Sequence, residues 1–332
     1  MRCTVLGGGS WGTALAVQLA QQGHEVQLWD RGAERCAHMN EHRRNPHYLK
    51  EVCLPDNLSA TPDLGAATRR AELLVPVIPS HALRGVLQQA VEDLPASVDI
   101  CCASKGIEEG TLATMWEVLK EEIPASHHAR VSLLYGPSFA LEVAQGKPTA
   151  VVVAGERRTS DLAAEAFHGG AFRTYYSEDV TGVCIGGSLK NVMAIACGVS
   201  DGVGLGTNAR AALITRGLAE VTRLAVAMGA NPLTMMGLAG MGDLVLTCTG
   251  SLSRNRRVGL GLGQGRALSE ILEELGEVAE GVRTTRSAFN LARSVGVEVP
   301  ITAEVYALLY EGKPAGKALA DLLQRERRPE LD

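Results

Sequence analysis

The sequence predicts an α/β protein: an N-terminal, doubly wound and mostly parallel sheet, followed by an all-helical C-terminal domain. Three observations support this prediction. A glycine-rich turn links the first strand to the first helix, strands and helical stretches then alternate up to about residue 177, and only helical patterns separated by glycine-rich loops follow. We therefore expect two domains, 1–177 and 178–332.

The first elements form a β-α-β unit around a Gly-x-Gly-x-x-Gly turn. An apolar strand over residues 2–6 precedes the turn, and a helix and a second strand over 25–30 follow it. Gly7 permits the tight turn, Gly9 lets the backbone approach a pyrophosphate, and Gly12 lets the helix pack closely on the strand. In this position the turn predicts a Rossmann-type dinucleotide-binding domain, with the anion at the N-terminus of the helix.

The end of the second strand leaves the choice of cofactor open. Asp30 would bind the ribose hydroxyls of NAD, whereas Arg31 would pair with the 2′-phosphate of NADP. Arg31 also fits a solvent-exposed helix start, so the sequence predicts NADP or NAD without distinguishing them.

The remaining pattern supplies the other elements. Further strands are predicted over 58–61, 72–78, 98–104, 131–134, 150–154 and 171–175, with helices around 32–43, 80–92, 110–122, 137–145 and 157–167. Pro76 is a misfit in a strand expected to be central, because proline removes a hydrogen-bond donor from a sheet. In the second domain, the glycine-rich stretches 202–206 and 259–265 are predicted to be loops, because no strand precedes them.

Two loops follow predicted strands at the edge where a parallel sheet binds ligands. Lys105 comes directly after the strand over 98–104 and would offer a point charge to a phosphate or a carbonyl. Gly136 and Ser138, beside a helix start, would offer backbone and hydroxyl donors. Ordinary turn chemistry explains all three residues equally well.

The stretch over residues 186–198 opens the second domain and is apolar on every side. Read as a helix capped by Ser188, it carries Lys190 and Asn191 as polar side chains in its first turn. Burial lowers the pKa of an ammonium, so Lys190 would accept a proton near neutral pH, as a general base does. Two alternatives stay open: a lysine that keeps its ammonium in water, and His81 as the base instead.

Two later stretches offer partners for this lysine and for an anionic substrate. Asp243 lies in a glycine-flanked apolar run, where an acid needs a counter-charge, and Lys190 is available to supply it. Ser253, Arg254 and Asn255 combine a hydroxyl, a guanidinium and an amide, the donors that a phosphate group requires. A solvated charged face explains the same three residues.

Composition excludes several classes of protein. With 332 residues, 46% of them hydrophobic, and a net charge of −5, the chain has no basic footprint for nucleic acid or an anionic membrane. The sequence contains no run of about 18 apolar residues, so no membrane anchor is predicted.

The eight cysteines lack Cys-x-x-Cys spacing and predict reduced thiols in a cytoplasmic protein. His38, His42 and His47 lie among arginines and are read as solvated, so no metal is predicted.

Seven motifs follow one another along the chain: Gly-Gly-Gly-Ser-Trp-Gly-Thr-Ala-Leu-Ala at 7–16, Ser-Lys-Gly-Ile-Glu at 104–108, Gly-Pro-Ser-Phe-Ala at 136–140, Gly-Gly-Ser-Leu-Lys-Asn-Val at 186–192, Asn-Ala-Arg-Ala-Ala-Leu-Ile-Thr-Arg-Gly at 208–217, Gly-Asp-Leu-Val-Leu-Thr-Cys-Thr at 242–249 and Ser-Arg-Asn-Arg-Arg at 253–257. In this order they resemble the bacterial NAD(P)-dependent glycerol-3-phosphate dehydrogenases. The resemblance extends from about residue 1 to 310, and the shared order is far more specific than any single motif.

The resemblance implies an oxidoreductase that interconverts dihydroxyacetone phosphate and sn-glycerol 3-phosphate with NADP or NAD. Lys190 would be the proton acceptor and donor. The substrate would lie among Lys105, Gly136, Ser138, Lys190, Asn191, Asp243, Thr247, Ser253, Arg254 and Asn255. The cofactor would contact Gly7, Gly9, Ser10, Trp11, Gly12, Arg31, Lys105, Ala140, Arg254, Val278 and Glu280.

The resemblance further implies a homodimer that supplies glycerophospholipid synthesis, without a membrane anchor or a nucleic-acid partner. Two positions depart from the family pattern: Ser188 stands where the family often has alanine, and Pro76 where it has an ordinary strand residue. Two other functions stay open. A sibling dehydrogenase acting on a hydroxy acid would need an arginine facing a carboxylate, and a non-catalytic nucleotide sensor would tolerate the loss of Lys190.

Overall fold

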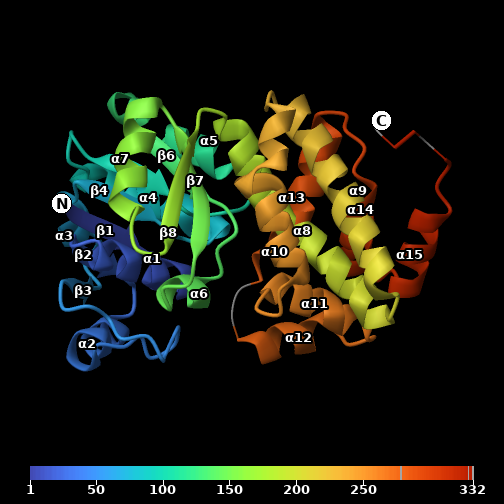
Figure 1. Ribbon diagram of the computed structural model, residues 1–332, viewed down its shortest axis with the longest axis horizontal. Helices are drawn as coiled ribbons and strands as arrows, with labels where there is room; N and C mark the ends of the chain where they lie inside the picture. The colour runs from blue at the N-terminus through green and yellow to red at the C-terminus, as the bar shows by residue number, and fades with distance from the viewer. Residues whose placement is uncertain (277–278, 328, 331–332) are drawn as a thin grey trace.

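The computed structural model describes residues 1–276, 279–327 and 329–330. In Figure 1 a sheet with its flanking helices fills one half of the molecule and a helical bundle fills the other, with β1 toward one end of the long axis and α15 toward the other. A sheet-based N-terminal part and a helical C-terminal part are the predicted fold class, which is confirmed.

The sheet in the described residues has the strand order β3-β2-β1-β4-β5-β6-β7-β8. The pairs from β3 to β6 are parallel, β7 is antiparallel to β6, and β8 is parallel to β7, so the sheet is mostly parallel as predicted. The strands are β1 (Arg2–Leu6), β2 (Glu25–Trp29), β3 (Leu58–Thr61), β4 (Leu73–Pro76), β5 (Asp99–Cys102), β6 (Val131–Tyr135), β7 (Thr149–Gly155) and β8 (Phe172–Ser177).

Helices cover both faces of this sheet. Those of the sheet-based part are α1 (Ser10–Gln21), α2 (Ala33–His42), α3 (Leu64–Arg69), α4 (Ser80–Ala90), η1 (Val91–Asp93), α5 (Met115–Glu122), η2 (Ala125–Arg130), α6 (Ala140–Ala144) and α7 (Arg157–Phe167). Side chains alternate along each strand, so Leu73 and Val75 of β4 join the apolar cluster under α1, α6 and α7, while Leu74 joins the cluster under α4 and α5. Burial on both faces is the reason that these strands read as nearly continuous apolar runs.

The predicted strand boundaries were too generous around Pro76. This residue is the last of β4, so its missing N–H falls where the ladder ends. Its carbonyl oxygen accepts a hydrogen bond from Ala103 N–H at 2.8 Å, directly after β5. The proline therefore ends the strand without weakening the middle of the sheet.

The helical part is built around α8 (Val180–Val203). Its other helices are α9 (Gly206–Ala227), η3 (Pro232–Met236), η4 (Leu238–Gly242), α10 (Asp243–Thr249), α11 (Arg254–Gly263), α12 (Leu268–Leu275), α13 (Glu280–Ser294), α14 (Pro300–Tyr310) and α15 (Ala315–Leu323). Helix α8 is long and apolar enough to cross a membrane, but 94% of its most apolar window is buried inside the protein. It is the core helix of the bundle, as its apolar residues on every side require.

The prediction that Ser188 caps this helix is wrong. The cap is Asp179, whose side chain accepts a hydrogen bond from Gly182 N–H at 2.9 Å, and Ser188 lies inside the helix. The apolar run before Ser188 simply continues the same buried helix toward the sheet. Lys190 and Asn191 consequently lie in the middle of α8, and not in its first turn.

The prediction of a loop over 259–265 is also wrong for most of that stretch, because α11 continues to Gly263. Glycines repeat at four-residue spacing on both helices where α11 crosses α8: Gly198 and Gly202 on one, Gly259 and Gly263 on the other. A Cβ built on Gly259 would lie 2.0 Å from the carbonyl oxygen of Ile195. These glycines therefore allow a close helix crossing, and a loop is not needed to explain them.

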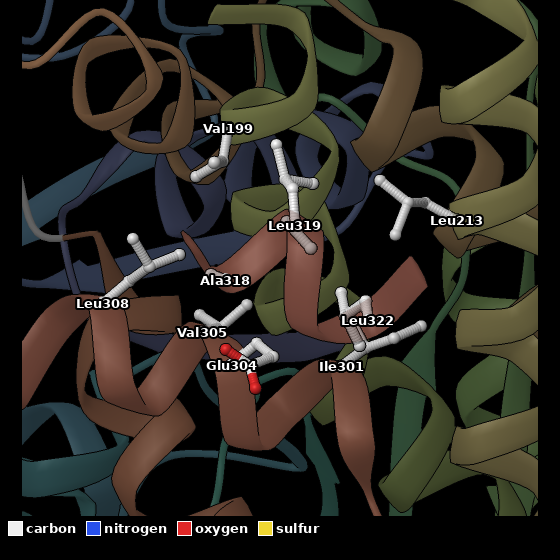
Figure 2. Close-up of a pocket in the computed structure, with 10 residues that line it drawn as sticks. Val199, Leu213, Ile301, Glu304, Val305, Leu308, Ala318, Leu319 and Leu322 are labelled. Carbon is white, nitrogen blue, oxygen red and sulfur yellow. The ribbon is translucent and has the colours of Figure 1, made fainter. Parts of the chain in front are cut away.

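A small cavity remains between α8, α9, α14 and α15. Figure 2 shows apolar side chains converging on it, among them Val199 of α8, Leu213 of α9, Val305 of α14 and Leu319 of α15. Its volume of about 20 Å³ holds roughly one water molecule and no substrate. This cavity is a packing gap, so the functional site must be sought elsewhere.

The helix crossing predicts opposite effects for two glycine-to-alanine substitutions. Gly259→Ala places a methyl group against the α8 backbone and should lower the free energy of unfolding by roughly 1–3 kcal/mol or more. Gly85→Ala, in the middle of α4, meets no atom within 4 Å. It should raise stability by roughly 0.5–1 kcal/mol, because alanine loses less backbone entropy in a helix. Urea unfolding of both variants tests this, and equal effects would refute the close crossing.

Candidate active site

The carboxyl ends of β1, β4, β5 and β6 share one edge of the sheet, and α8 passes over this edge. A Cβ built on Gly187 would lie 2.4 Å from the ring of Tyr135, the last residue of β6. Ser188 Oγ accepts a hydrogen bond from Gly106 N–H at 3.2 Å and donates to a carbonyl oxygen of Gly106 or Cys184. The loop after β5 is thus attached directly to α8, at the edge where doubly wound sheets bind ligands.

At this junction two lysines meet one carboxylate. Lys190 Nζ donates to Asp243 Oδ1 at 2.5 Å, and Lys105 Nζ donates to Asp243 Oδ2 at 2.8 Å. The side chain of Asp243 is fully buried, whereas those of Lys190 and Lys105 are 12% and 11% exposed. The predicted contact between Lys190 and Asp243 is confirmed, and the two ammonium groups are the part of the cluster that a substrate can reach.

The electrostatics of this cluster favour proton exchange near neutral pH. Burial lowers the pKa of Lys190 to about 8, with Asp243 opposing the change and Lys105 adding to it. Burial is the largest cause of the low pKa of Lys190, and the ammonium of Lys105 lowers it further because like charges disfavour the charged form. The alternative of a lysine with its ammonium in open water is excluded by this burial.

Three other predicted residues surround the lysines. The carbonyl oxygen of Gly136 accepts from Lys105 Nζ at 3.4 Å and from Ser138 Oγ at 3.0 Å. Gly136 has a φ of +138°, which favours glycine, and this turn brings the loop after β6 back toward Lys105. Thr247 Oγ1 donates to the backbone oxygen of Asp243 at 2.6 Å, one turn earlier in α10.

A chain of amide groups links three helices beside Lys190. Gly281 N–H, at the start of α13, donates to Asn255 Oδ1 at 2.9 Å, and Asn255 Nδ2 donates to Asn191 Oδ1 at 2.9 Å. A backbone N–H can only donate, so Gly281 fixes the orientation of both amides. Within the described residues Asn191 Nδ2 makes no hydrogen bond, so it remains a donor for a substrate oxygen.

The start of α11 and the start of α13 bring further charges to the site. Ser253 caps α11, accepting from Arg256 N–H at 3.2 Å, and Arg254 is the first residue of that helix. Burial raises the pKa of Glu280 to about 7, against the opposing positive charge of Arg254 and of the two lysines. Glu280 thus lies within electrostatic reach of the cluster. Val278, also predicted to contact the cofactor, lies outside the described residues.

The glycine-rich turn fits a dinucleotide. A Cβ built on Gly12 would lie 1.8 Å from the carbonyl oxygen of Gly7, and Gly7 itself has a φ of +120°. Gly9, the first residue outside α1, has open space beside its α-carbon, and no side chain caps the N–H groups of this helix end. Gly7 and Gly12 are therefore in close contact, while the space beside Gly9 at the start of α1 is open, as approach of a pyrophosphate requires.

The predicted neighbours of this turn lie around it. Ser10 and Trp11 open α1, and the buried indole nitrogen of Trp11 has no hydrogen-bond partner among the described residues. Ala140, the first residue of α6, packs with Trp11 on the same apolar cluster. Arg31 is exposed after β2, beside Asp30, which is buried. An unpaired buried donor at this place fits a site completed by a ligand.

His81, the alternative base, lies outside the lysine cluster. It is exposed at the start of α4 and makes no hydrogen bond in the described part of the chain. Partial desolvation lowers the pKa of His81, and the nearby Arg283 lowers it further. Across the described ranges, no group of three His, Cys, Asp or Glu side chains is arranged to hold a metal ion.

Sequence reasoning missed three contacts that shape the site. They are the link from Ser188 to Gly106, the N–H of Gly281 and the ion pair of Arg35 with Asp30. Ser188 was visible as a polar residue in an apolar run, and Arg35 as a basic residue five positions after an acid. No sequence pattern pointed to Gly281, because it acts through its backbone N–H and not through a side chain.

Comparisons with known proteins agree over nearly the whole chain. A family model described as the NAD-dependent glycerol-3-phosphate dehydrogenase N-terminus matches residues 2–161, and one described as the C-terminus of the same enzyme matches residues 179–320. A glycerol-3-phosphate dehydrogenase [NAD(P)+] of Anaeromyxobacter dehalogenans is 52% identical over 332 residues, covering 100% of both chains. One from Geobacter sp. (strain M21) is 51% identical, covering 99% of this chain and 98% of the relative.

Solved structures give the same result. The crystal structure of glycerol-3-phosphate dehydrogenase from Coxiella burnetii is 40% identical, with a TM-score of 0.92 over 98% of this chain and 99% of that one. A D-mandelate dehydrogenase with NADH, 13% identical at a TM-score of 0.61, shares only the fold. On the evidence of both family models and of relatives matched along their full length, the chain belongs to the NAD-dependent glycerol-3-phosphate dehydrogenase family.

Proposed function

We propose that Lys190 exchanges the proton in the reaction of this family, the NAD(P)H-dependent reduction of dihydroxyacetone phosphate to sn-glycerol 3-phosphate. The observation that carries the proposal is the buried cluster of Lys190, Asp243 and Lys105 at the sheet edge. The bound nicotinamide supplies or accepts the hydride. The protein must then hold the substrate oxygen beside a group that can gain or lose a proton.

Each member of the cluster has a separate task. Lys190, with its pKa near 8, takes the hydroxyl proton during oxidation and returns it to the carbonyl oxygen during reduction. Lys105 polarises the same oxygen and adds to the effect of burial in lowering the pKa of Lys190. Asp243 accepts from both ammonium groups, so it orients them and limits their mutual repulsion.

The neighbouring donors suit the phosphate group of the substrate. Arg254 offers a guanidinium, and Asn191 and Asn255 offer amide N–H groups whose direction Gly281 fixes. Gly136, Ser138, Thr247 and Ser253 complete the proposed substrate site around the lysines. Binding the phosphate away from the reacting carbon orients that carbon toward the base.

The glycine-rich turn supports the proposed cofactor site. Gly7, Gly9 and Gly12 leave room for the pyrophosphate, and we assign the surrounding contacts to Ser10, Trp11, Arg31, Lys105, Ala140, Arg254 and Glu280. We also propose that 1–177 is the dinucleotide-binding domain and that 178–332 completes the substrate site. A cofactor bound at the sheet edge then faces the lysines of the cluster.

We further propose that the enzyme is a cytoplasmic homodimer whose product enters glycerophospholipid synthesis. Support for the compartment comes from the cysteines, all of which are free thiols and all of which except Cys53 are buried. Support for the dimer is the family resemblance. Sedimentation equilibrium of the purified chain should give twice the monomer mass, and a monomer at micromolar concentration would contradict it.

Removing the amine should abolish most of the turnover. Lys190→Met should lower kcat by roughly 10²–10⁴-fold and leave the fold intact. In the unmodified enzyme, oxidation needs the neutral amine, so its rate should rise with pH to a plateau above about 8, whereas reduction, which needs the ammonium, should fall over the same range. Absorbance at 340 nm follows both directions. Near-normal turnover of the variant would remove Lys190 from the mechanism.

The carboxylate between the lysines should set the position of that pH profile. Asp243→Asn removes the charge that raises the pKa of Lys190, so the midpoint for oxidation should move to lower pH by about one pH unit or more. Stability should also fall, because two buried ammonium groups then lack a counter-charge. An unchanged midpoint in a folded variant would show that Asp243 does not act on Lys190.

The amide chain predicts an effect confined to the phosphate-bearing substrate. Asn255→Asp still accepts from Gly281, but it cannot donate to Asn191 and adds a negative charge. The KM for dihydroxyacetone phosphate should rise roughly 10–100-fold, the cost of a lost bond to a charged group. The KM for NADH should change little. The control Asn290→Asp, on the exposed face of α13, should leave both KM values unchanged.

A further inference from the structure

Asp30 and Arg35 form an ion pair just after β2, at the strand end where a Rossmann-type domain distinguishes NAD from NADP. Asp30, directly after β2, accepts at Oδ1 from Gly32 N–H at 2.7 Å and from Arg35 Nε at 3.0 Å, and Arg35 Nη2 donates to the same oxygen. The side chain of Asp30 is 7% exposed and that of Arg35 is 29% exposed. One carboxylate oxygen is thus saturated by the protein, while part of the guanidinium still faces solvent.

The pair lies against the glycine-rich turn on one side and the start of α2 on the other. A Cβ built on Gly8 would lie 2.4 Å from Asp30 Oδ2, so this second oxygen borders the turn. A Cβ built on Gly32 would lie 2.9 Å from Arg35 Cζ, so the guanidinium packs on the backbone after β2. In a Rossmann-type domain the adenosine ribose lies at this strand end, within reach of both groups.

The two side chains have opposite preferences for the ribose. A free carboxylate accepts hydrogen bonds from the 2′- and 3′-hydroxyls of NAD and repels a 2′-phosphate, whereas a guanidinium binds the phosphate. When the two side chains are paired, the carboxylate is less available to the ribose hydroxyls and the guanidinium is less available to a 2′-phosphate. Arg31 adds a second, exposed guanidinium that makes no hydrogen bond or ion pair within the described ranges.

We propose that the Asp30–Arg35 ion pair is the cofactor-selecting device of this enzyme. The pair stays closed when NAD(H) binds, with Asp30 Oδ2 accepting from the ribose. It opens when NADP(H) binds, because Arg35 turns from Asp30 to the 2′-phosphate beside Arg31. This proposal rests on the proposed function, and it makes Arg35, absent from the predicted cofactor contacts, the residue that determines 2′-phosphate affinity.

Binding of two nicotinamide-free probes tests the selector without relying on turnover. Calorimetry with ADP-ribose and with 2′-phospho-ADP-ribose reports ribose recognition directly, and kcat/KM for NADH and NADPH provides the second readout. Arg35→Gln should weaken 2′-phospho-ADP-ribose by roughly 10–100-fold, as expected for a lost charge-assisted contact, and leave ADP-ribose unchanged or tighter. Asp30→Asn should do the reverse, weakening ADP-ribose and tightening the phosphorylated probe.

Two further variants keep the test interpretable. Arg35→Lys retains the charge and should keep part of the affinity for the 2′-phosphate, which separates charge from loss of packing. Arg70→Gln removes an exposed arginine at the end of α3 and should change neither probe, which controls for net charge. Thermal unfolding of each variant identifies any that fail to fold.

Several results would overturn the proposal. Equal weakening of both probes by Arg35→Gln in a folded variant would make the ion pair purely structural, and no change in either probe would remove Arg35 from the site. Failure of the unmodified enzyme to bind ADP-ribose would overturn the proposed function as well. Normal probe binding with full turnover in Lys190→Met would overturn the catalytic assignment and leave the selector standing.

Discussion

The structure depends on one buried carboxylate that holds two ammonium groups. Asp243 is fully buried, and an unpaired charge in that position would be costly, so its ion pairs with Lys190 and Lys105 stabilise it. One lysine comes from the core helix of the bundle and the other from a loop of the sheet. The same contacts that satisfy the charge therefore join the two halves of the molecule at the place where we propose that Lys190 exchanges the proton.

Close backbone approach is what allows that meeting. Glycines in a helix cost roughly 0.5–1 kcal/mol each relative to alanine, yet α8 retains Gly187 against the ring of Tyr135 and Gly198 against the backbone of α11. The first contact brings Lys190 to the sheet edge, and the second brings Asn255 to Asn191. Helix stability is given up at these two positions, where a side chain would have pushed α8 away from Tyr135 and from α11.

The site contains many hydrogen-bond donors, and contacts with backbone groups hold these donors in place. Gly281 N–H orients two asparagines in sequence, while Ser188 fixes the loop that carries Lys105. The phosphate and carbonyl oxygens of dihydroxyacetone phosphate would be acceptors for these groups in the proposed site. The proposed binding of these oxygens accounts for two lysines and an arginine near one another, in a chain where acids outnumber lysine and arginine together.

The sequence by itself determined the features that follow from local residue patterns. These are eight strands in the right places, a phosphate-binding turn, a buried lysine and an acid that needed a partner. These features follow from side-chain periodicity and from the cost of burying charge. Tertiary structure alone decided that Ser188 lies inside a helix, that Gly259, Gly261 and Gly263 belong to α11, and that Arg35 neutralises Asp30. Each of these depends on a neighbour that sequence patterning does not identify: a distant backbone, or the rotamer of a side chain five residues away.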